Sequence, residues 1–422
     1  MKNYIKIISL IYFNLTYCRI DDIDLINWKK SNIDVTVVGY ILNSDGLGRL
    51  SIGFIENFND KLNLNFIPTR PSELKDVNDK AIKIINNKVN DIGNVSIFFD
   101  VIKCPYGEYF KNVPDSLIKI AYSFWESDRI PEEWIKPLNE KFDAVVTACP
   151  FLVKVYKDSG VKIPIFLLPN GIYIDEFLNE PIKEKANKLF TFGCSTTLLD
   201  KKNVYKLVVA FSNKFGNNKN FKLRLHSRYS DIREKSKIVE FINKNSIKNI
   251  EIIDKILSQN EYLNFMKSLD CYVLISKGEG FSVTPRESIA LGIPTIVSNN
   301  TAHEVLCQTP YFISIKSDIK VPADYSYLIM FTGKKIIGNQ YDCYIKDVED
   351  TLEYVYNNYE LCLEKAKGGR EWVKQYTYPA LEKKYLNLVK PQKVILGDDN
   401  IITDDYLMTN SKELYHKYNI LN

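Results

Sequence analysis

The sequence predicts an α/β protein of two doubly wound units, each a parallel sheet covered by helices, which face one another across a cleft. Three observations predict this fold: a length of 422 residues, short apolar runs alternating with amphipathic stretches, and one break in that pattern near the middle. The length suits two domains that each bury a core. With 45% hydrophobic and 26% charged residues, the chain is not disordered throughout.

Strands are expected at short apolar runs, and those of the first unit are apolar on both faces, as expected for strands buried between two helix layers. In the first unit these runs are VTVVGY (35–40), VSIFFD (95–100), IKIAYSF (118–124), DAVVTA (143–148) and IPIFLL (163–168). In the second unit they are LFTFG (189–193), FKLRLHS (221–227), IEII (250–253), CYVLIS (271–276), PTIVS (294–298) and YFISI (311–315). Helices are expected between the strands, for example at 204–215 and 259–269.

The break in the pattern lies at 169–188, a segment with two prolines, a glycine and scattered charge. This segment is the predicted hinge, so residues 1–170 are expected to form the first domain and residues 171–372 the second. A long helical pattern covers 346–390, and a polar tail follows at 391–422.

Charge and composition restrict the partners. The chain has 56 basic and 52 acidic residues with no basic block, which argues against nucleic-acid binding. Eight separate cysteines and three histidines lack the spacing of a zinc site, so no metal is expected, and the cysteines suggest buried, reduced thiols in a cytoplasmic protein. Residues 1–20 leave two alternatives open: a secretory signal or anchor, or an amphipathic helix or strand, which the interrupted apolar stretch favours.

The stretch SKGEGFSVTPRESIALGIPTIVS (276–298) carries the most chemical information. It follows an apolar strand, and Thr284 is expected to cap a helix with Glu287 completing a capping box. The preceding loop 278–281 then lies before a helix N-terminus, which favours an anion such as a diphosphate. Glu279 and Glu287 are expected to face one site, the first near a sugar and the second accepting hydrogen bonds from ribose hydroxyls.

This stretch resembles the signature of the GT-B glycosyltransferases of the large retaining group 1 family, the glycosyltransferase family 4-like enzymes. The positions that match the signature are Glu279, Gly280, Phe281, Pro285, Glu287, Ala290, Gly292 and Pro294. The PNG turn at 169–171 and the pair Lys202-Asn203 also match elements of the family. The resemblance covers roughly residues 35–390.

The resemblance implies the GT-B fold, in which two Rossmann-like domains face across a cleft and the second domain binds the donor. Helix 373–390 is then expected to cross back onto the first domain. The implied reaction moves a sugar from a nucleoside-diphosphate sugar to a glycan, lipid-linked or protein acceptor, with retention at the anomeric carbon. No metal and no cofactor are implied, and peripheral contact with a membrane is left open.

The site residues are carried over position by position. Expected catalytic residues are Glu279, Glu126 and Lys202; Glu126 lies in a Trp-Glu-Ser string where other members have a histidine, and no histidine precedes His226. Lys202 is implied to contact the donor diphosphate. The full set of expected donor-binding residues is Gly46, Gly48, Lys202, Gly280, Phe281, Ser282, Arg286 and Glu287.

Two departures from the family pattern keep alternatives open. Cys194 follows Gly193 where the family often has an arginine, which leaves Arg228 and Arg286 as candidates for a second phosphate-binding cation, and Tyr173 replaces an aspartate. The alternatives are a non-catalytic GT-B protein that binds sugar nucleotides or glycans, and a GT-B sugar-nucleotide epimerase. A dinucleotide-dependent oxidoreductase is disfavoured, because no complete GxGxxG motif is present.

Overall fold

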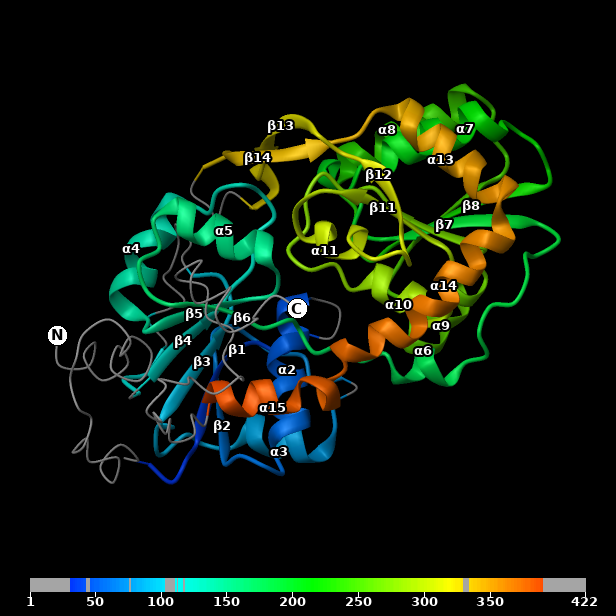
Figure 1. Cartoon of the computed structure of the whole chain (residues 1–422). Helices are drawn as coiled ribbons and strands as arrows, with labels where there is room; N and C mark the ends of the chain where they lie inside the picture. The colour runs from blue at the N-terminus through cyan, green and yellow to red at the C-terminus, as the bar shows by residue number, and fades with distance from the viewer. Residues whose placement is uncertain are drawn as a thin grey trace, which may run out of the picture.

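The computed structural model describes residues 31–42, 46–75, 77–102, 111, 113–116, 118–328 and 334–389. Two six-stranded sheets with parallel strands form the two halves of the molecule (Figure 1). The predicted α/β fold class is therefore confirmed. The expectations for residues 1–20 and 391–422 fall outside the described residues.

The first sheet has the strand order β2-β1-β3-β4-β5-β6. Its strands are β1 (Val35–Gly39), β2 (Leu64–Pro68), β3 (Val95–Phe99), β4 (Ile118–Tyr122), β5 (Ala144–Thr147) and β6 (Ile165–Leu167). One apolar cluster covers each face of this sheet, as expected for strands that are apolar on both sides. Strand β2 was not expected from the sequence. It lies at the sheet edge, where a terminal proline is tolerated because no neighbour needs its N–H.

The second sheet has the order β12-β11-β10-β7-β8-β9. Its strands are β7 (Phe190–Ser195), β8 (Phe221–Ser227), β9 (Ile250–Asp254), β10 (Cys271–Leu274), β11 (Thr295–Asn299) and β12 (Ile313–Lys316), each overlapping an expected run. In the second sheet, β8 and β9 follow β7 on one side, and β10 lies on the other side, so the strand order reverses between β7 and β10. In the first sheet the strand order reverses between β1 and β3. Ligands of such sheets bind beyond the carboxyl ends of the strands at these reversal points.

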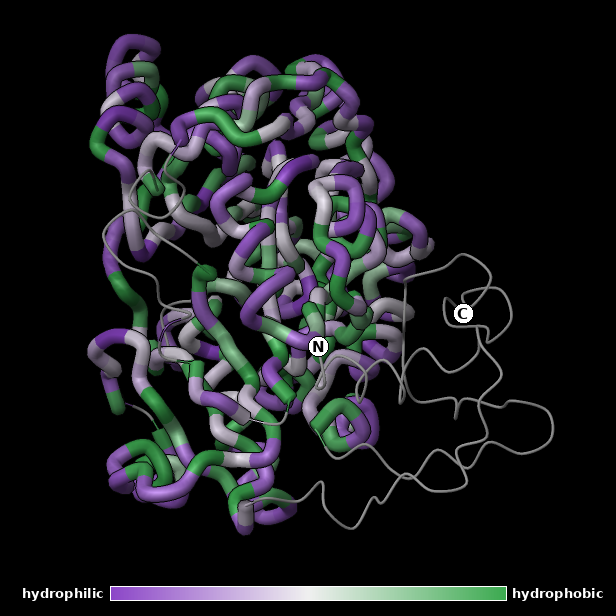
Figure 2. Tube along the Cα trace, turned by 90° about the vertical axis from the view of Figure 1, so that its left-hand side faces the viewer, coloured by the Kyte–Doolittle hydropathy of each residue, from purple (hydrophilic) through white to green (hydrophobic). Residues whose placement is uncertain are grey.

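The helices cover both sheets, and Figure 2 shows the outer ones alternating hydrophilic and hydrophobic segments along their turns. The first half contains α2 (Gly46–Phe58), α3 (Asp79–Asn86), α4 (Glu132–Lys141) and α5 (Pro150–Ser159). The linker and second half contain α6 (Asp175–Asn179), α7 (Val204–Phe215), α8 (Ile232–Lys244), α9 (Gln259–Lys267), α10 (Thr284–Ala290), α11 (Glu304–Cys307), α13 (Ile345–Asn357), α14 (Tyr359–Val373) and α15 (Tyr378–Val389). Short 3-10 turns lie at η3 (Asp200–Lys202), η4 (Thr301–His303), η5 (Ser326–Leu328) and η6 (Lys374–Tyr376).

The pattern at 346–390 folds as three helices rather than one, and the last of them, α15, lies against α2 in the first half (Figure 1). The ring of Tyr378 fills space at two glycines: a Cβ at Gly53 would lie 1.8 Å from its Oη, and one at Gly171 2.4 Å from its ring. Tyr385 donates a hydrogen bond to the carbonyl of Pro169 at 3.2 Å and accepts one from the N–H of Gly171 at 3.1 Å. The PNG turn is thus fixed by α15.

An antiparallel hairpin, β13 (Ile319–Asp324) with β14 (Ile336–Asp342), was also not expected. It is inserted between β12 and α13 of the second half, and Figure 1 shows it in yellow reaching toward α5 of the first half. Ala323, Tyr325 and Ile337 are buried in the same apolar cluster as Trp125, so the hairpin completes part of the core of the first half.

Among the described residues, no helix combines the length and apolar character needed to cross a bilayer. Six cysteines lie in the described ranges, and all six are free thiols. Cys18 and Cys104 lie outside them.

Candidate functional site

The loops after β7 and β10 bring Lys202 and Glu279 together at the reversal point of the second sheet. These two strands are neighbours, so their carboxyl ends place the two side chains on one edge. The Nζ of Lys202 donates to Oε1 of Glu279 at 2.5 Å, and both side chains are almost fully buried. Burial alone would raise the pKa of Glu279, but the ammonium of Lys202, with a smaller contribution from Lys201, holds it well below its ordinary range. Glu279 is therefore a carboxylate.

A second ion pair joins the two halves of the protein. The ammonium of Lys201, in η3, donates to the carboxylate of Glu126, which lies in the loop after β4. Lys201 is buried, with 8% of its side chain exposed, whereas Glu126 is partly exposed. The structure thus brings Glu126 to the same place as Lys202 and Glu279. Sequence reasoning missed Lys201, although the doubled lysine beside Asn203 was a visible signal.

The backbones of the two halves touch at Gly278 and Gly280. A Cβ at Gly278 would lie 2.1 Å from the carbonyl oxygen of Glu126, and one at Gly280 would lie 3.3 Å from that of Trp125. Glycine, which has no Cβ, permits this close approach. The loop that carries Glu279 and the loop that carries Glu126 therefore meet without space for any larger residue at 278.

Strained backbone surrounds the same loops. Among the described non-glycine residues, four have positive φ, and three of these flank the site: Asn203 (59°), Ser282 (71°) and Thr301 (47°). Thr301 Oγ1 accepts a hydrogen bond from the N–H of Glu279 at 2.9 Å, and Ser282 Oγ lies 2.9 Å from Nε2 of His303. Such strain persists only where surrounding contacts fix it, and it concentrates at functional sites.

His303 supports the Glu279 loop from behind as a buried, neutral imidazole. Its Nδ1 lies 3.2 Å from the carbonyl oxygen of Ser298, and its Nε2 contacts Ser282. Burial lowers the pKa of His303 to about 4, in spite of the nearby carboxylate of Glu279. Sequence reasoning assigned no role to this histidine.

The depressed pKa of His303 predicts an acid-sensitive fold. In the unfolded chain this histidine takes up its proton near pH 6.5, and in the folded chain only near pH 4. The unfolded state thus binds more protons in this window, so the free energy of unfolding falls as the pH falls from about 6.5 to about 4, by roughly 3 kcal/mol for this group. In urea unfolding across this pH range, the free energy of unfolding should fall more steeply with decreasing pH for the wild type than for His303→Gln. Equal slopes would contradict a buried neutral His303.

Glu287 lies in α10, where the expected capping box is wrong. The N-cap is Val283, without a side-chain cap, because the hydroxyl of Thr284 instead accepts a hydrogen bond from Tyr272 at 2.6 Å. The Glu287 carboxylate accepts a hydrogen bond from the hydroxyl of Tyr262 at 2.6 Å and lies 3.7 Å from Nη1 of Arg49, a residue of α2 in the first half. Burial raises the pKa of Glu287, while Arg49 and Tyr262 oppose this.

Arg286 is fully buried within its own loop. Its guanidinium donates to the carbonyls of Phe281 and Ser282 at 2.6 and 2.7 Å and lies between the rings of Phe281 and Tyr376. These contacts shape the loop before α10. The predicted contacts of Arg286 and Phe281 with a donor stay predictions. In the structure the two side chains pack against each other.

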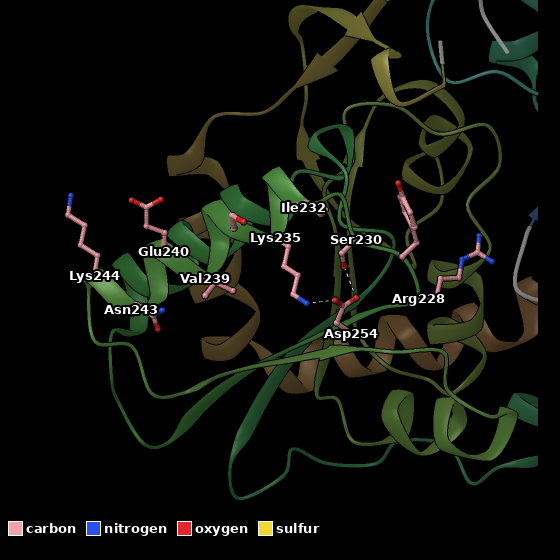
Figure 3. A pocket seen from close by; sticks show the side chains of 11 residues that line it. Arg228, Ser230, Ile232, Lys235, Val239, Glu240, Asn243, Lys244 and Asp254 are labelled. Carbon is pink, nitrogen blue, oxygen red and sulfur yellow. Dashed lines mark hydrogen bonds and ion pairs between the residues drawn. The ribbon is translucent and has the colours of Figure 1, made fainter. Parts of the chain in front are cut away.

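Arg228 lies at the carboxyl end of β8, where a hollow of about 1050 Å³ opens beside α8. Figure 3 shows Lys235 and Ser230 reaching Asp254, with Arg228 on the other side of that group. Burial raises the pKa of Cys194, the residue in the place of the family's arginine, to about 12, so this thiol is neutral.

The position of Gly46 and Gly48 after the run 35–40 predicts a loop before a helix, but both glycines lie in the first turn of α2, which corrects the expected start of this helix. A Cβ at Gly48 would lie 2.6 Å from the backbone nitrogen of Leu42, so close packing explains this glycine. At Gly46, by contrast, a built Cβ meets no atom of the described residues within 4 Å, apart from its chain neighbours and the backbone of its own helix. Tyr173, in the place of an expected aspartate, donates a hydrogen bond to Glu56 of α2 at 2.6 Å.

Residues 175–308 match the model of the family described as glycosyl transferases group 1. An uncharacterised protein of Sulfolobus islandicus rod-shaped virus 1 is 22% identical over 316 residues, which cover 68% of this chain and 80% of that protein. The family match contains Lys202, Glu279 and Glu287 and confirms the resemblance that their motifs indicated.

Solved glycosyltransferases share the fold. HepE from Anabaena, in complex with UDP and glucose, is 8% identical with a TM-score of 0.60, over 85% of this chain and 100% of HepE. A glycosyltransferase from Rickettsia africae is 14% identical with a TM-score of 0.59, over 85% and 98%. A mutant of TarM from S. aureus, in a complex that includes UDP, is 14% identical with a TM-score of 0.53, over 70% of this chain and 55% of TarM, so this chain spans about half the length of TarM. The predicted GT-B fold is confirmed.

Proposed function

We propose, from the match of residues 175–308 to the model of the group 1 glycosyltransferases, that the protein transfers a sugar from a nucleoside-diphosphate sugar to a glycan, lipid-linked or protein acceptor. The observation that carries the proposal is the meeting of Lys202, Glu279 and the Lys201–Glu126 pair between the two halves. UDP is the first nucleotide to test, because HepE and TarM are structural relatives whose complexes contain it.

The two adjacent lysines would stabilise the leaving diphosphate. Lys201 and Lys202 place two ammonium groups beyond the carboxyl end of β7, at the reversal point of the sheet. A positive charge held where negative charge develops lowers the barrier to bond breaking, and a buried site strengthens it. Lys201 would thus provide the second positive charge that the sequence leaves unassigned at Cys194. We propose that the reaction needs no metal ion for this reason.

The transfer would retain the anomeric configuration. In the proposed step, the acceptor oxygen bonds to C1 of the sugar on the face that the diphosphate leaves, the C1–O bond to the phosphate breaks, and the acceptor proton passes to the departing phosphate oxygen. Glu279 would hold the sugar, and its low pKa keeps it charged at neutral pH. Glu126 reaches the same place from the first half, where the acceptor would enter.

Glu287 would bind the ribose hydroxyls of the donor. In the structure its carboxylate is closed off by Tyr262 and, more loosely, by Arg49, whose side chain is 47% exposed. Ribose hydroxyls would take the place of Arg49, because the Arg49–Glu287 contact is longer than the Tyr262–Glu287 hydrogen bond. The exposed side chain of Arg49 can move into solvent. Tyr262 would keep the carboxylate oriented.

Thermal unfolding with UDP, GDP, ADP and dTDP, each in EDTA, tests the donor site. A nucleotide at a hundred times its dissociation constant should stabilise the protein by about 2.7 kcal/mol. Glu287→Gln should weaken the affinity for that nucleotide about tenfold or more, since hydrogen bonds to a charged group contribute about 1.5–3 kcal/mol.

The matched control is Glu364→Gln, which changes a glutamate on the outer surface of α14 whose partner is Lys367. It should leave nucleotide affinity unchanged. Stabilisation that appears only without EDTA would contradict the metal-free proposal. Unchanged affinity in Glu287→Gln would contradict the ribose assignment, and no stabilisation by any nucleotide would favour a GT-B protein that binds glycans without catalysis.

A further inference from the structure

The β13–β14 hairpin holds the loop that carries Glu126. Ser127 Oγ donates a hydrogen bond to the carbonyl of Ile337 at 2.7 Å, and the N–H of Asn339 donates to Oδ1 of Asp128, also at 2.7 Å. The amide of Gln340 donates to the carbonyl of Glu126 itself at 3.1 Å. A segment of the second half therefore fixes the position of the loop of the first half that enters the site.

The chain between the two hairpin strands places Tyr327 at this site. The Nζ of Lys201 lies 5.3 Å from the centre of its ring, at the distance of a cation–π contact. Its hydroxyl is buried and has no hydrogen-bond partner among the described residues. Burial raises the pKa of Tyr327 well above its ordinary value, and the carboxylates of Glu126 and then Glu279 raise it further, so this hydroxyl keeps its proton.

A buried hydroxyl without a partner is costly, so its retention requires an explanation. The carboxylates of Glu126, Glu279 and Asp324 act on this hydroxyl, and Lys201 lies at the ring. The proposed function assigns Glu279 to the sugar and Lys201 to the diphosphate. A phenol that cannot ionise here can donate one hydrogen bond and accept others. Its natural complement is a hydroxyl group of a sugar.

We propose that Tyr327 is a specificity-determining residue that hydrogen-bonds a hydroxyl of the transferred sugar. This assignment rests on the proposed function, and it places in the site a residue of the hairpin, outside the segment that matches the family model. Tyr327 would act on the sugar and not on the nucleotide, because its ring contacts Lys201, assigned to the leaving group, and Glu279, assigned to the sugar, acts on its hydroxyl. The hairpin thereby has two roles, holding the Glu126 loop and selecting the sugar.

The test compares Tyr327→Phe with the wild type by calorimetry, using UDP, UDP-glucose and UDP-N-acetylglucosamine, or the equivalent ligands of whichever nucleotide stabilises the protein. The expected result is a dissociation constant for the diphosphate within about twofold of the wild type. The dissociation constant for the preferred sugar nucleotide should rise at least about fivefold. A site built to bond a hydroxyl should also discriminate less between the two sugars once the phenol hydroxyl is lost.

The test uses the ratio of the dissociation constant for the sugar nucleotide to that for the diphosphate. A general distortion of the fold weakens the binding of both ligands and leaves this ratio unchanged. Tyr341→Phe, on β14 of the same hairpin with its hydroxyl near Asp128, is the matched control and should leave the ratio unchanged. An unchanged ratio in Tyr327→Phe, or an effect confined to the KM of the acceptor, would overturn the assignment. If the wild type bound no nucleotide, the proposed function would fail first, and Tyr327 would lose its role with it.

Discussion

Gly278→Ala is expected to lower the kcat/KM of sugar transfer by at least about 100-fold, since a displacement of about 1 Å in a site can cost this much. A Cβ at this position would lie 2.1 Å from the carbonyl oxygen of Glu126, a backbone atom that the hairpin holds in place. The clash lies between the two halves and outside their cores. The halves should therefore move apart while each stays folded, which separates the Lys201–Glu126 pair.

Initial rates and small-angle scattering check this prediction together. The radius of gyration of Gly278→Ala should exceed that of the wild type, with a small change in thermal stability. Gly216→Ala is the control: this glycine ends α7 at a φ of 52°, and the nearest atom to a built Cβ lies 3.8 Å away. That change should cost stability by about 1 kcal/mol and leave the rate unchanged. Full activity in Gly278→Ala with unchanged scattering would show that the close approach is not needed.

Glu279→Gln is expected to lower kcat by roughly 10²–10³, the usual cost of removing one group that stabilises the transition state. The same substitution should not weaken the binding of the diphosphate. The carboxylate holds Lys202 at 2.5 Å, so its loss leaves that ammonium without its partner and available to the diphosphate. Affinity for UDP, or for whichever diphosphate binds, should stay level or increase, whereas Lys202→Met should weaken it.

Asp270→Asn is the control for burial, because Asp270 is another buried carboxylate with a lysine partner, Lys183, at 2.9 Å. Its loss should lower stability without lowering kcat. Single-turnover rates and calorimetry on the three variants separate these outcomes. A Glu279→Gln enzyme with the wild-type kcat, or one that loses diphosphate affinity as Lys202→Met does, would contradict the division of roles between the sugar and the phosphates.

The sheets were predictable because buried parallel strands are rich in apolar residues, and eleven expected apolar runs became strands. The strands that sequence reasoning missed are of another kind. Strand β2 is short and lies at an edge, and β13 alternates half-buried with exposed residues, so neither shows the fully apolar pattern. The capping box at Thr284 failed because a tertiary partner, Tyr272, takes the hydroxyl that local geometry would have used.

The candidate site was partly predictable for a similar reason. Glu279, Glu287 and Lys202 stand in local strings whose spacing is visible, and Glu126 stands beside a tryptophan. Arg49, Tyr262 and Tyr327 stand in no such string, and each contributes by a contact with a residue at least 25 positions away. Lys201 stands beside Lys202 in a visible string, but its partner Glu126 lies 75 positions away. No periodicity or spacing in one sequence encodes contacts of this range.

By itself, the sequence determined the α/β fold class, most strands of the two sheets and the segment that matches the group 1 family model, because these follow from local apolar patterns and short motifs. Only the tertiary structure decided which cations face which carboxylates, how closely Gly278 approaches Glu126, and that a hairpin of the second half reaches into the first. These features depend on how two separately patterned halves pack against each other. That packing is set by complementary surfaces distant in sequence, and it places the charges and the buried Tyr327 hydroxyl at one point.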